Sequence, residues 1–306
     1  MDENKINMED FEKISLLGQG NGGEVFLVKH KITGTQYAMK VVKKEKKKLT
    51  RIAIEHEILT KTQHPFIAKE YFYLENDLYS YIIMEYYSKG DFYKFLKSQP
   101  GKHLTEVQTK FYASCVLLAL EYLHLNGVFY RDLKPENILI RESGHIVLSD
   151  FDLSLCCNNI TQNVIKTPYT HQCAVCSEPI ITDDNCYGTL EYLAPEIIEG
   201  KSYSSIVDYW EFGILIFEMI YGRTPFRGKN EKETEKLIKE CHLKFPKDNK
   251  ISPKCKNLVK HLLKHHPKER LGYQGAAEIK DHPFFHNVKF QLLVNQPLAT
   301  QQLPNI

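Results

Sequence analysis

A short polar segment in the middle of the chain carries the side chains that are best suited to chemistry. Asp132 and Lys134 are followed by Asn137, and Asp150 stands thirteen residues after Asn137. In phosphoryl transfer, a carboxylate orients the attacking hydroxyl and takes its proton, a lysine neutralises the moving phosphoryl group, and oxygen ligands hold Mg²⁺. We therefore predict Asp132 and Lys134 as the catalytic residues. Asn137 and Asp150 are predicted as the ligands of Mg²⁺.

A glycine-rich segment near the N-terminus fits the phosphates of a nucleotide. Gly18, Gly20 and Gly23 form the pattern G-x-G-x-x-G, and Val25 follows two residues later. Because glycine has no Cβ atom, the backbone amides in such a segment can approach a phosphate chain closely. A dinucleotide-binding fold would continue into a helix, and a Walker loop would need Gly-Lys followed by Ser or Thr, but here a strand pattern follows. The pattern is weak by itself, and it predicts a hairpin that covers a nucleotide.

A lysine follows on the strand that is predicted after this hairpin. It is Lys40, at the end of the segment Tyr37-Ala38-Met39-Lys40. A single lysine is most often a surface residue. Its presence in one chain with the glycines and with the polar segment around Asp132 instead favours a lysine that binds phosphate oxygens.

The residues around these motifs predict the elements that position them. Alternating β-prone segments, separated by turns, predict a small antiparallel sheet with one helix over residues 11–86. After Gly90 the hydrophobic spacing becomes helical, and Thr105 with Gln108 forms a capping box for a helix at 105–124. Further helices are predicted at 206–221, 231–241 and 252–264. The predicted fold class is α+β, with a small β part and a larger, mainly helical part.

The composition is that of an ordinary globular protein and argues against several functions. The 306 residues include 40 Lys and Arg against 38 Asp and Glu, and the net charge of +2 disfavours a general nucleic-acid binder. No segment reaches the ~18 apolar residues of a membrane span, and the charged N-terminus is unlike a signal peptide. Eight irregularly spaced cysteines favour a reducing compartment. We expect a monomeric, cytoplasmic protein without a transmembrane segment or a nucleic-acid partner.

Taken together, the motifs resemble those of the eukaryotic protein kinases over about residues 11–290. The resemblance implies a bilobal kinase fold, with an N-lobe at 11–86 and a C-lobe at 87–290 between short tails at 1–10 and 291–306. It implies that ATP and Mg²⁺ are the cofactors and that the γ-phosphoryl group of ATP passes to serine or threonine in proteins. Serine or threonine, rather than tyrosine, is favoured because a lysine stands two residues after the predicted base.

The resemblance also implies where ATP binds. Lys40 would bind the α- and β-phosphates and pair with Glu55 on the N-lobe helix, for which Glu57 is a competing choice that fits the motif less well. The glycines of the hairpin would cover the phosphates. The other residues implied around the nucleotide are the roof residues Leu17, Val25 and Ala38, the floor residue Leu139, the gatekeeper Met84, and Glu85, Tyr87 and Asp91 in and after the hinge.

Details of the motifs resemble the AGC group of kinases. Tyr130 stands where histidine is commoner, and the segments at 189–196 and 282–285 are typical of the group. Asp152 stands where most kinases have glycine, as in the plant phototropin kinases and the fungal kinases that activate lipid flippases. An insertion at about 155–182 in the activation segment also resembles this branch.

The same resemblance implies structural and substrate-binding roles. Glu196 is expected to pair with Arg270, and Asp208 is expected to hold the backbone near Asp132. Three carboxylates would favour substrates with arginine or lysine before the acceptor Ser or Thr. These residues are Asp91, Glu136 and Glu218. The sequence does not identify an upstream regulator.

Two features depart from the kinase pattern. Glu70 occupies a strand position that is usually leucine, and a charged side chain there is costly unless the strand register shifts or a partner exists. Asn185 replaces the residue that most active AGC kinases phosphorylate, although Asp183 and Asp184 could partly replace the phosphate as acceptors for Arg131. These departures argue for the alternative function, a pseudokinase that binds and regulates a partner without chemistry, whereas the presence of every phosphoryl-transfer residue argues against it.

Two further segments allow more than one interpretation. The activation-segment insertion contains a C-x-x-C pair, which has zinc-ligand chemistry but is a weak signal when it stands alone. The candidate ligands are Cys156, Cys157, His171, Cys173, Cys176 and, just beyond the insertion, Cys186. Five lysines among residues 43–48 predict a solvated loop, with partner binding or nuclear import as the less favoured interpretations.

Overall fold

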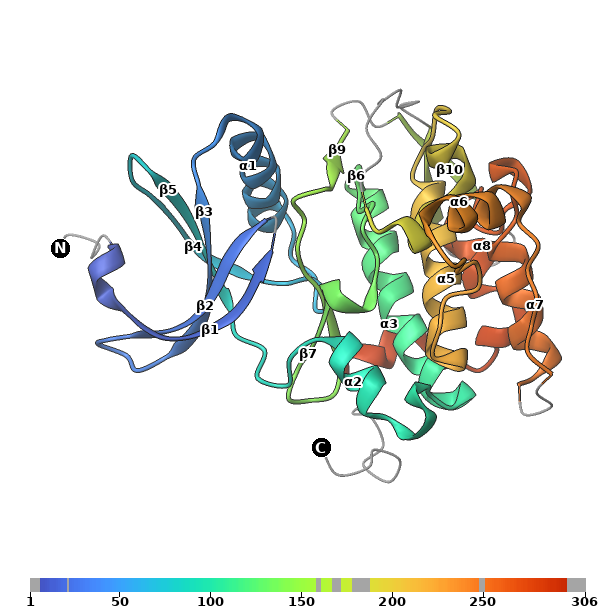
Figure 1. Ribbon diagram of the computed structural model, residues 1–306, viewed down its shortest axis with the longest axis horizontal. Helices are drawn as coiled ribbons and strands as arrows, with labels where there is room; N and C mark the ends of the chain where they lie inside the picture. The colour runs from blue at the N-terminus through green and yellow to red at the C-terminus, as the bar shows by residue number, and fades with distance from the viewer. Residues whose placement is uncertain are drawn as a thin grey trace.

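The computed structural model has two lobes, which Figure 1 shows side by side with the N-lobe on the left. The structure describes residues 6–20, 22–157, 161–166, 172–177, 188–247 and 251–295. Within these ranges, only the backbone is described for Lys47 and for residues 161–166 and 172–177. The α+β fold class and the bilobal arrangement that the sequence predicts are both confirmed.

The N-lobe is built on a five-stranded antiparallel sheet with the strand order β1-β2-β3-β5-β4. Two consecutive hairpins place the glycine-rich turn between β1 and β2 close to β3, the strand that carries Lys40. The strands lie within residues 11–86, as predicted. They are β1 (Phe11–Gly20), β2 (Gly23–His30), β3 (Gln36–Lys43), β4 (Glu70–Glu75) and β5 (Tyr79–Glu85).

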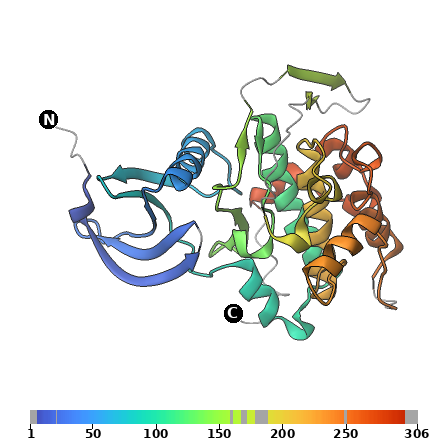
Figure 2. The ribbon, with the colours of Figure 1, turned by 45° about the horizontal axis from the view of Figure 1, so that its top comes forward.

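Helix α1 (Lys46–Lys61) packs between this sheet and the C-lobe strand β9 (Leu155–Cys156), as Figure 2 also shows. The prediction of a solvated loop at 43–48 is wrong for its second half, because Lys46 to Lys48 form the first turn of α1. The backbone amide of Lys48 donates to the carbonyl of Glu45 at 2.8 Å. Lysine is a good helix former, so the charges of the run do not prevent the turn.

The C-lobe is built around α3 (Glu106–Leu125) and α5 (Ile206–Tyr221). Every residue of α5 except the last is buried, which its apolar sequence explains. The predicted capping box at the start of α3 is confirmed, since Thr105 Oγ1 accepts from the Gln108 amide (3.3 Å) and Gln108 Oε1 accepts from the Thr105 amide (2.9 Å). The other helices are α2 (Phe92–Ser98), α4 (Pro195–Ile198), α6 (Glu231–Glu240), α7 (Pro253–Leu262) and α8 (Ala276–Lys280).

Short strand pairs frame the loops on the side of the C-lobe that faces the N-lobe. Strand β6 pairs with β9, and β7 pairs with β8. Residues 130–137, between β6 and β7, hold the predicted catalytic side chains and are called the catalytic loop below. A further hairpin, β10 with β11, lies within the predicted insertion. The bounds are β6 (Val128–Phe129), β7 (Ile138–Ile140), β8 (Ile146–Leu148), β10 (Thr161–Lys166) and β11 (Gln172–Ser177).

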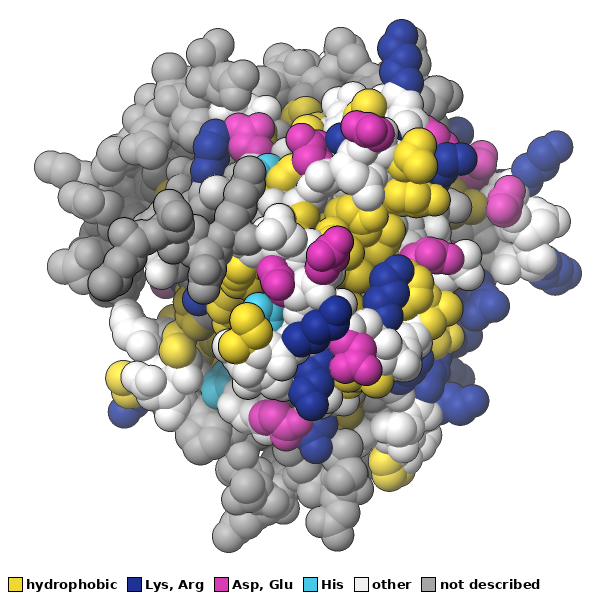
Figure 3. Space-filling view, turned by 90° about the vertical axis from the view of Figure 1, so that its left-hand side faces the viewer, with side chains coloured by type: hydrophobic (Ala, Val, Ile, Leu, Met, Phe, Trp, Pro, Cys, Tyr) yellow, Lys and Arg dark blue, Asp and Glu magenta, His cyan; other side chains and the backbone are white. Residues whose placement is uncertain are grey.

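Two hydrophobic clusters form the core. The larger cluster fills the C-lobe and continues under α1, and the smaller one lies in the N-lobe sheet around Phe11, Met39 and Tyr81. Figure 3 views the N-lobe end and shows hydrophobic side chains at the surface between basic and acidic ones. None of the helices in the described ranges is both long and apolar enough to cross a bilayer.

Candidate active site

The catalytic loop is held by helix α5. Asp208, in the first turn of α5, is fully buried, and its carboxylate accepts hydrogen bonds from the backbone amides of Tyr130 (3.0 Å) and Arg131 (2.8 Å). The same carboxylate lies 2.6 Å from Nε2 of His124. The contact that the sequence predicts between Asp208 and the loop backbone is therefore present.

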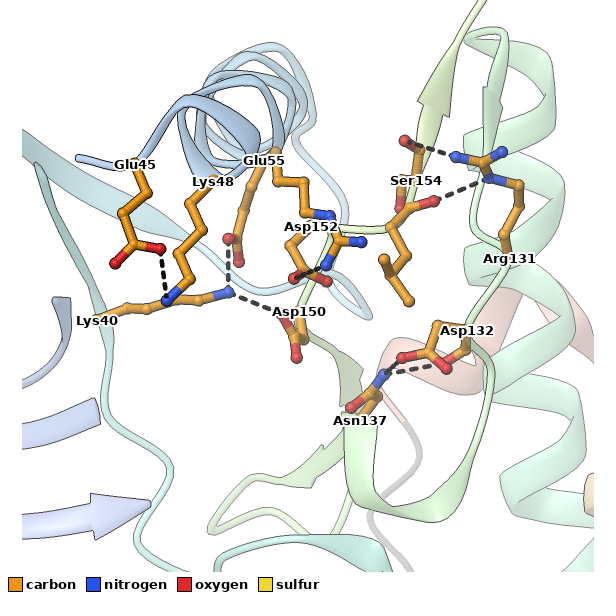
Figure 4. Close-up of polar contacts among 12 residues, drawn as sticks. Lys40, Glu45, Lys48, Glu55, Arg131, Asp132, Asn137, Asp150, Asp152 and Ser154 are labelled. Carbon is orange, nitrogen blue, oxygen red and sulfur yellow. Dashed lines mark hydrogen bonds and ion pairs between the residues drawn. The ribbon is translucent and has the colours of Figure 1, made fainter. Parts of the chain in front are cut away.

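Three of the predicted residues meet within this loop, and Figure 4 shows two of them, Asp132 and Asn137. The Nζ atom of Lys134 lies 2.8 and 3.0 Å from the two carboxylate oxygens of Asp132. The side-chain nitrogen of Asn137 donates to the Asp132 carboxylate (2.7 Å) and to the Asp132 backbone carbonyl (2.9 Å). Since the nitrogen is used in this way, the amide oxygen of Asn137 is the atom that could coordinate a cation.

Lys40 connects β3, α1 and the segment after β8. Its Nζ atom lies 2.6 Å from Glu55 Oε2 and 2.7 Å from Asp150 Oδ1 (Figure 4). Burial lowers the pKa of Lys40, but the charges of Asp150 and Glu55 outweigh burial and raise this pKa above its ordinary value. Glu57, the competing choice, instead pairs with Lys61 on the surface. Lys40 therefore keeps its positive charge where the phosphates of a nucleotide are expected.

The two predicted ligands of Mg²⁺ have oxygen atoms of a suitable type. Burial raises the pKa of Asp150, but the charge and hydrogen bond of Lys40, together with the charges of Lys134 and Arg51, outweigh burial, so the pKa of this carboxyl lies below its ordinary value. The side chain of Asp150 is 41% exposed although one of its oxygens contacts Lys40. A charged carboxylate and the amide oxygen of Asn137 are the ligand types that Mg²⁺ prefers. The predicted pair of ligands therefore has the right chemistry for this ion.

The hairpin between β1 and β2 leaves space for a ligand. A Cβ atom added at Gly18 or Gly20 would meet nothing within 4 Å, so their backbone is open on that side. A Cβ atom at Gly22 would lie 3.4 Å from Nζ of Lys40, which shows how closely the hairpin covers the lysine. Gly23 has a φ of 127°, and a Cβ atom there would lie 2.4 Å from a backbone oxygen of β3. The sheet itself therefore requires Gly23.

The residues predicted around the adenine come from both lobes. Ala38 and Met84 are register partners on β3 and β5, and both are buried. Val25 is the register partner of Gly18 on the hairpin, and the preceding Leu17 is 39% exposed. On the C-lobe side, the floor residue Leu139 lies on β7. A backbone bridge joins it to Asp91, the residue before α2.

The two predicted hinge residues use their side chains within the protein. Glu85 accepts a hydrogen bond from Nη1 of Arg141 (2.9 Å) and from the hydroxyl of Tyr87 (3.2 Å). The Arg141 guanidinium also lies 5.4 Å from the centre of the Tyr87 ring. This cluster joins the hinge to the turn after β7, so contacts of Glu85 and Tyr87 to an adenine would come from the backbone.

Asp152 links the segment after Phe151 to helix α1. Its Oδ2 atom lies 3.9 Å from Nη1 of Arg51, and its side chain is 12% exposed (Figure 4). Two residues earlier, Asp150 has a φ of 58°. Asp152 therefore restrains this segment in two ways, through a backbone that is less free than that of glycine and through an ion pair to the helix that carries Glu55.

We expect Asp152→Gly to raise the affinity of inhibitors that require the segment 150–152 in a flipped conformation. The gain should be about three- to tenfold, because glycine frees the backbone and the ion pair with Arg51 is lost. Dissociation constants of one such inhibitor, and of one that binds the unflipped segment, would measure the effect. Arg51→Gln is the matched control, since it removes the ion pair and keeps the aspartate. Unchanged affinity in Asp152→Gly would contradict the backbone argument.

Glu70 satisfies both conditions that the sequence sets for a charge at its position. The pairing of β4 with β5 shifts register between Glu70 and Phe72, and Oε1 of Glu70 lies 2.7 Å from Nδ1 of His56 on α1. The His56 ring in turn stacks on Tyr73 at a centroid distance of 4.0 Å. Burial raises the pKa of Glu70. The side chain thus links α1 to the sheet instead of extending an apolar stack.

The side chains of the activation segment are described only at its two ends, with the backbone of β10 and β11 between them. Arg131 donates from Nε to the carbonyl of Leu153 (2.8 Å) and from Nη1 to the hydroxyl of Tyr203 (2.7 Å). The acceptors predicted for it, Asp183 and Asp184, lie outside the described residues, so their role stays a prediction. Glu196, just after this segment, forms the predicted pair with Arg270 through two contacts of 2.7 and 2.9 Å.

The proposed zinc ligands also lie mostly outside the described side chains. The side chains of Cys156 and Cys157 are both half-buried. Burial raises the pKa of Cys156, which disfavours the thiolate that a metal would need. His171 and Cys186 lie outside the described residues, and only the backbone is described for the remaining two, Cys173 and Cys176. An insertion without a metal, which is the favoured interpretation, and a zinc site, which is the less favoured one, are therefore both untested.

The three acidic residues expected at the peptide groove influence one another. Asp91 is the N-cap of α2 and accepts from the amide of Lys94 (2.8 Å). Glu218 is buried and accepts from the hydroxyl of Tyr192 (2.5 Å). Burial raises the pKa of Glu136, and the charges of Glu218 and Asp91 raise it further. A cation placed among the three carboxylates would relieve this repulsion.

Sequence reasoning missed two residues that contact this site. Glu211 on α5 accepts a hydrogen bond from the backbone amide of Leu133, inside the catalytic loop, at 2.9 Å. Its position three residues after Asp208 puts both on one helix face, and this spacing was a usable signal. No comparable signal indicated Arg51 as the partner of Asp152, because an arginine on a helix is ordinarily interpreted as a surface residue.

Comparison with known proteins agrees with this geometry. The family model described as the protein kinase domain matches residues 11–285. Flippase kinase 1 of Saccharomyces cerevisiae is 45% identical over 299 residues, which cover 95% of this chain and 33% of that protein. Serine/threonine-protein kinase nrc-2 of Neurospora crassa is 42% identical over 320 residues, which cover 97% of this chain and 51% of that protein. Serine/threonine-protein kinase RHS3 of Arabidopsis thaliana is 38% identical over 339 residues, which cover 94% of this chain and 68% of that protein. The chain thus spans a third to a half of the length of the two fungal relatives.

Proposed function

Because this chain belongs to the protein kinase family, on the branch of the fungal flippase kinase and the AGC-type plant kinases, we propose that it phosphorylates serine and threonine in proteins with ATP as the donor. The observation that carries this proposal is the meeting of Asp132, Lys134 and Asn137 within one largely buried loop. The contacts of Lys40 with Glu55 and Asp150 support it from the N-lobe side.

The geometry supports a distinct task for each residue. Asp132 accepts the proton of the substrate hydroxyl while the oxygen of that hydroxyl bonds to the γ-phosphorus. At the same time, the bond between the γ-phosphorus and the oxygen that bridges the β- and γ-phosphates breaks. Lys134, 2.8 Å from the Asp132 carboxylate, is placed to neutralise charge on the moving group. Lys40 holds the α- and β-phosphates. Mg²⁺, held by Asn137 and Asp150, would supply positive charge that neutralises the phosphates.

A direct assay tests the proposal. The purified chain should transfer radioactive phosphate from ATP, in the presence of Mg²⁺, to a peptide with one serine and arginines two and three residues before it. Asp132→Asn is the matched inactive control, because it alters only the predicted base. The proposal fails if the wild-type protein transfers no phosphate, or if Asp132→Asn transfers as much as the wild-type protein.

The pseudokinase alternative has lost one of its two arguments. It rested on a costly charge at Glu70 and on Asn185 in place of a phosphorylated residue. Glu70 has a partner in His56, and the contact between Lys40 and Glu55 is formed without an apolar residue at that strand position. Asn185 lies outside the described residues, so the argument from its side chain is unchanged.

We further propose that the substrates carry basic residues before the acceptor. Asp91, Glu136 and Glu218 form the negative region that supports this preference, since burial and mutual repulsion raise the pKa of Glu136. Lys97 lies 3.7 Å from Glu218, so one basic side chain already reaches this carboxylate. An arginine of the substrate would compete with Lys97 for the same oxygen atoms.

We expect Glu136→Gln and Glu218→Gln each to lower kcat/KM for the arginine-containing peptide by about tenfold, because each removes one partner of a charge-assisted hydrogen bond. The matched peptide with alanine in place of both arginines should be affected far less. The exposed Glu12 provides the control variant Glu12→Gln, which should leave both peptides unchanged. Equal rates for the two peptides with the wild-type protein, or a preference for proline after the acceptor, would rule out the basic preference.

A further inference from the structure

Helix α5 presents two buried acidic side chains to the catalytic loop. Asp208 and Glu211 are three residues apart and therefore lie on one face of the helix; they are 0% and 1% exposed. Asp208 accepts from the amides of Tyr130 and Arg131, at 3.0 and 2.8 Å. Glu211 accepts from the amide of Leu133 through Oε2, at 2.9 Å. The backbone is thus held immediately before and immediately after Asp132.

The backbone between these two anchors is under strain. Arg131 has a φ of 64°, in the left-handed region that residues other than glycine rarely adopt. A strained conformation of this kind persists only where its surroundings hold it in place. Asp208 restrains the side that precedes Asp132, and Glu211 restrains the side that follows it. Loss of either anchor would let the peptide planes beside Asp132 rotate.

We propose that Glu211 is a positioning residue for phosphoryl transfer, which holds Leu133 and thereby directs the Asp132 carboxylate toward the substrate hydroxyl. Glu211 touches neither the substrate nor the reacting atoms, so it acts through the loop backbone alone. The inference rests on the proposed function, because that function makes Asp132 the base. It extends the function to a side chain that the motif around Asp132 does not contain.

The surroundings of Glu211 indicate which of its properties matters. Burial and the neighbouring charge of Asp208 raise the pKa of Glu211 well above its ordinary value, and the charge of Asp132 acts in the same direction. These effects favour the neutral acid. A neutral carboxylic acid accepts a hydrogen bond through its carbonyl oxygen, as the side-chain amide of glutamine does. Reach and an acceptor atom, rather than negative charge, are therefore what Leu133 requires.

Three substitutions separate these properties. Glu211→Gln keeps the reach and the acceptor, Glu211→Asp keeps the carboxyl but is one methylene too short, and Glu211→Met keeps the volume without a strong acceptor. We expect kcat within about twofold of wild type for Glu211→Gln, and a loss of about tenfold or more for Glu211→Asp and Glu211→Met. KM for ATP should stay within about twofold in all three, because Lys40, Glu55 and Asp150 keep their contacts.

A readout that does not depend on activity completes the test. Amide hydrogen exchange over residues 130–137 should be faster in Glu211→Asp and Glu211→Met and unchanged in Glu211→Gln, while exchange in α3 stays slow. Ile238→Ala, at a fully buried position on α6 away from the loop, is the control for general destabilisation and should leave kcat unchanged at temperatures where it is folded.

The possible outcomes decide between the explanations. Unchanged kcat and exchange in Glu211→Met would overturn the inference, and so would a Glu211→Gln variant that is as impaired as Glu211→Asp. If Glu211→Met does not fold, the comparison of Glu211→Gln with Glu211→Asp decides. If the wild-type protein transfers no phosphate, the proposed function fails, and hydrogen exchange alone decides whether Glu211 holds the loop.

Discussion

Asp132→Asn is expected to lower kcat for peptide phosphorylation by about 10²- to 10⁴-fold, the range that a positioned general base contributes. The carboxamide has nearly the same shape as the carboxylate, but it cannot take the proton of the attacking hydroxyl. Binding of ATP should change little, because Lys40 and its two carboxylate partners lie outside the catalytic loop. The measurement is kcat at saturating peptide and ATP, together with the dissociation constant of ATP.

Asp77→Asn is a matched control for this prediction, since it makes the same chemical change on the exposed turn between β4 and β5. It should keep the wild-type kcat. Thermal unfolding of both variants should resemble that of the wild-type protein. If Asp132→Asn retained more than about a tenth of the wild-type kcat, the assignment of Asp132 as the base would be wrong.

Glu196→Gln is expected to reduce the free energy of unfolding by about 3–5 kcal/mol, because it leaves the buried guanidinium of Arg270 without its charged partner. The two side chains are 3% and 1% exposed, and their two contacts of 2.7 and 2.9 Å form a bidentate pair. Arg270 also lies 5.1 Å from the centre of the Trp210 ring. The midpoint of thermal unfolding should fall by about 5–15 °C.

The surface pair of Glu57 with Lys61 provides the control for this second prediction. Both of these side chains are largely exposed. Glu57→Gln removes an ion pair by the same chemical change and should leave the midpoint almost unchanged, because solvent screens exposed charges. Circular dichroism or differential scanning calorimetry would compare the three proteins. A Glu196→Gln protein that unfolds together with Glu57→Gln would show that the buried pair contributes no more than the exposed one.

Features that depend on neighbours along the chain were predictable. The capping box of α3 involves residues three apart, and the bounds of α5 and β5 follow from the spacing of apolar and β-prone residues. Asp132, Lys134 and Asn137 lie within six positions, so one loop brings them together whenever its backbone is held. Local geometry of this kind leaves few alternatives, because a short segment has few ways to arrange its side chains.

The first turn of α1 shows where local reasoning failed. Five lysines among residues 43–48 have no apolar spacing, so the sequence favoured a loop. The helix nevertheless begins at Lys46, because the apolar face of its later turns, including Ile52, Ile58 and Leu59, is buried against the core. Packing of the later turns can support a first turn whose own residues gain little from it.

Residues far apart in the sequence account for what could not be predicted from composition and spacing. Leu133 and Glu211 are 78 residues apart, and only the spacing of Glu211 from Asp208 was a signal that Glu211 faces the catalytic loop. The sequence showed that a charge at Glu70 is costly, but it did not show how the charge is accommodated, because the partner His56 lies on another element. The amino-acid sequence alone predicted the α+β fold class and the family, which are confirmed, and it proposed the phosphate-binding and catalytic side chains, whose roles stay predictions. Tertiary packing decided which carboxylate pairs with Lys40, how Glu70 is accommodated and which side chains hold the catalytic loop, since such contacts form only when the burial of apolar surface brings distant segments together.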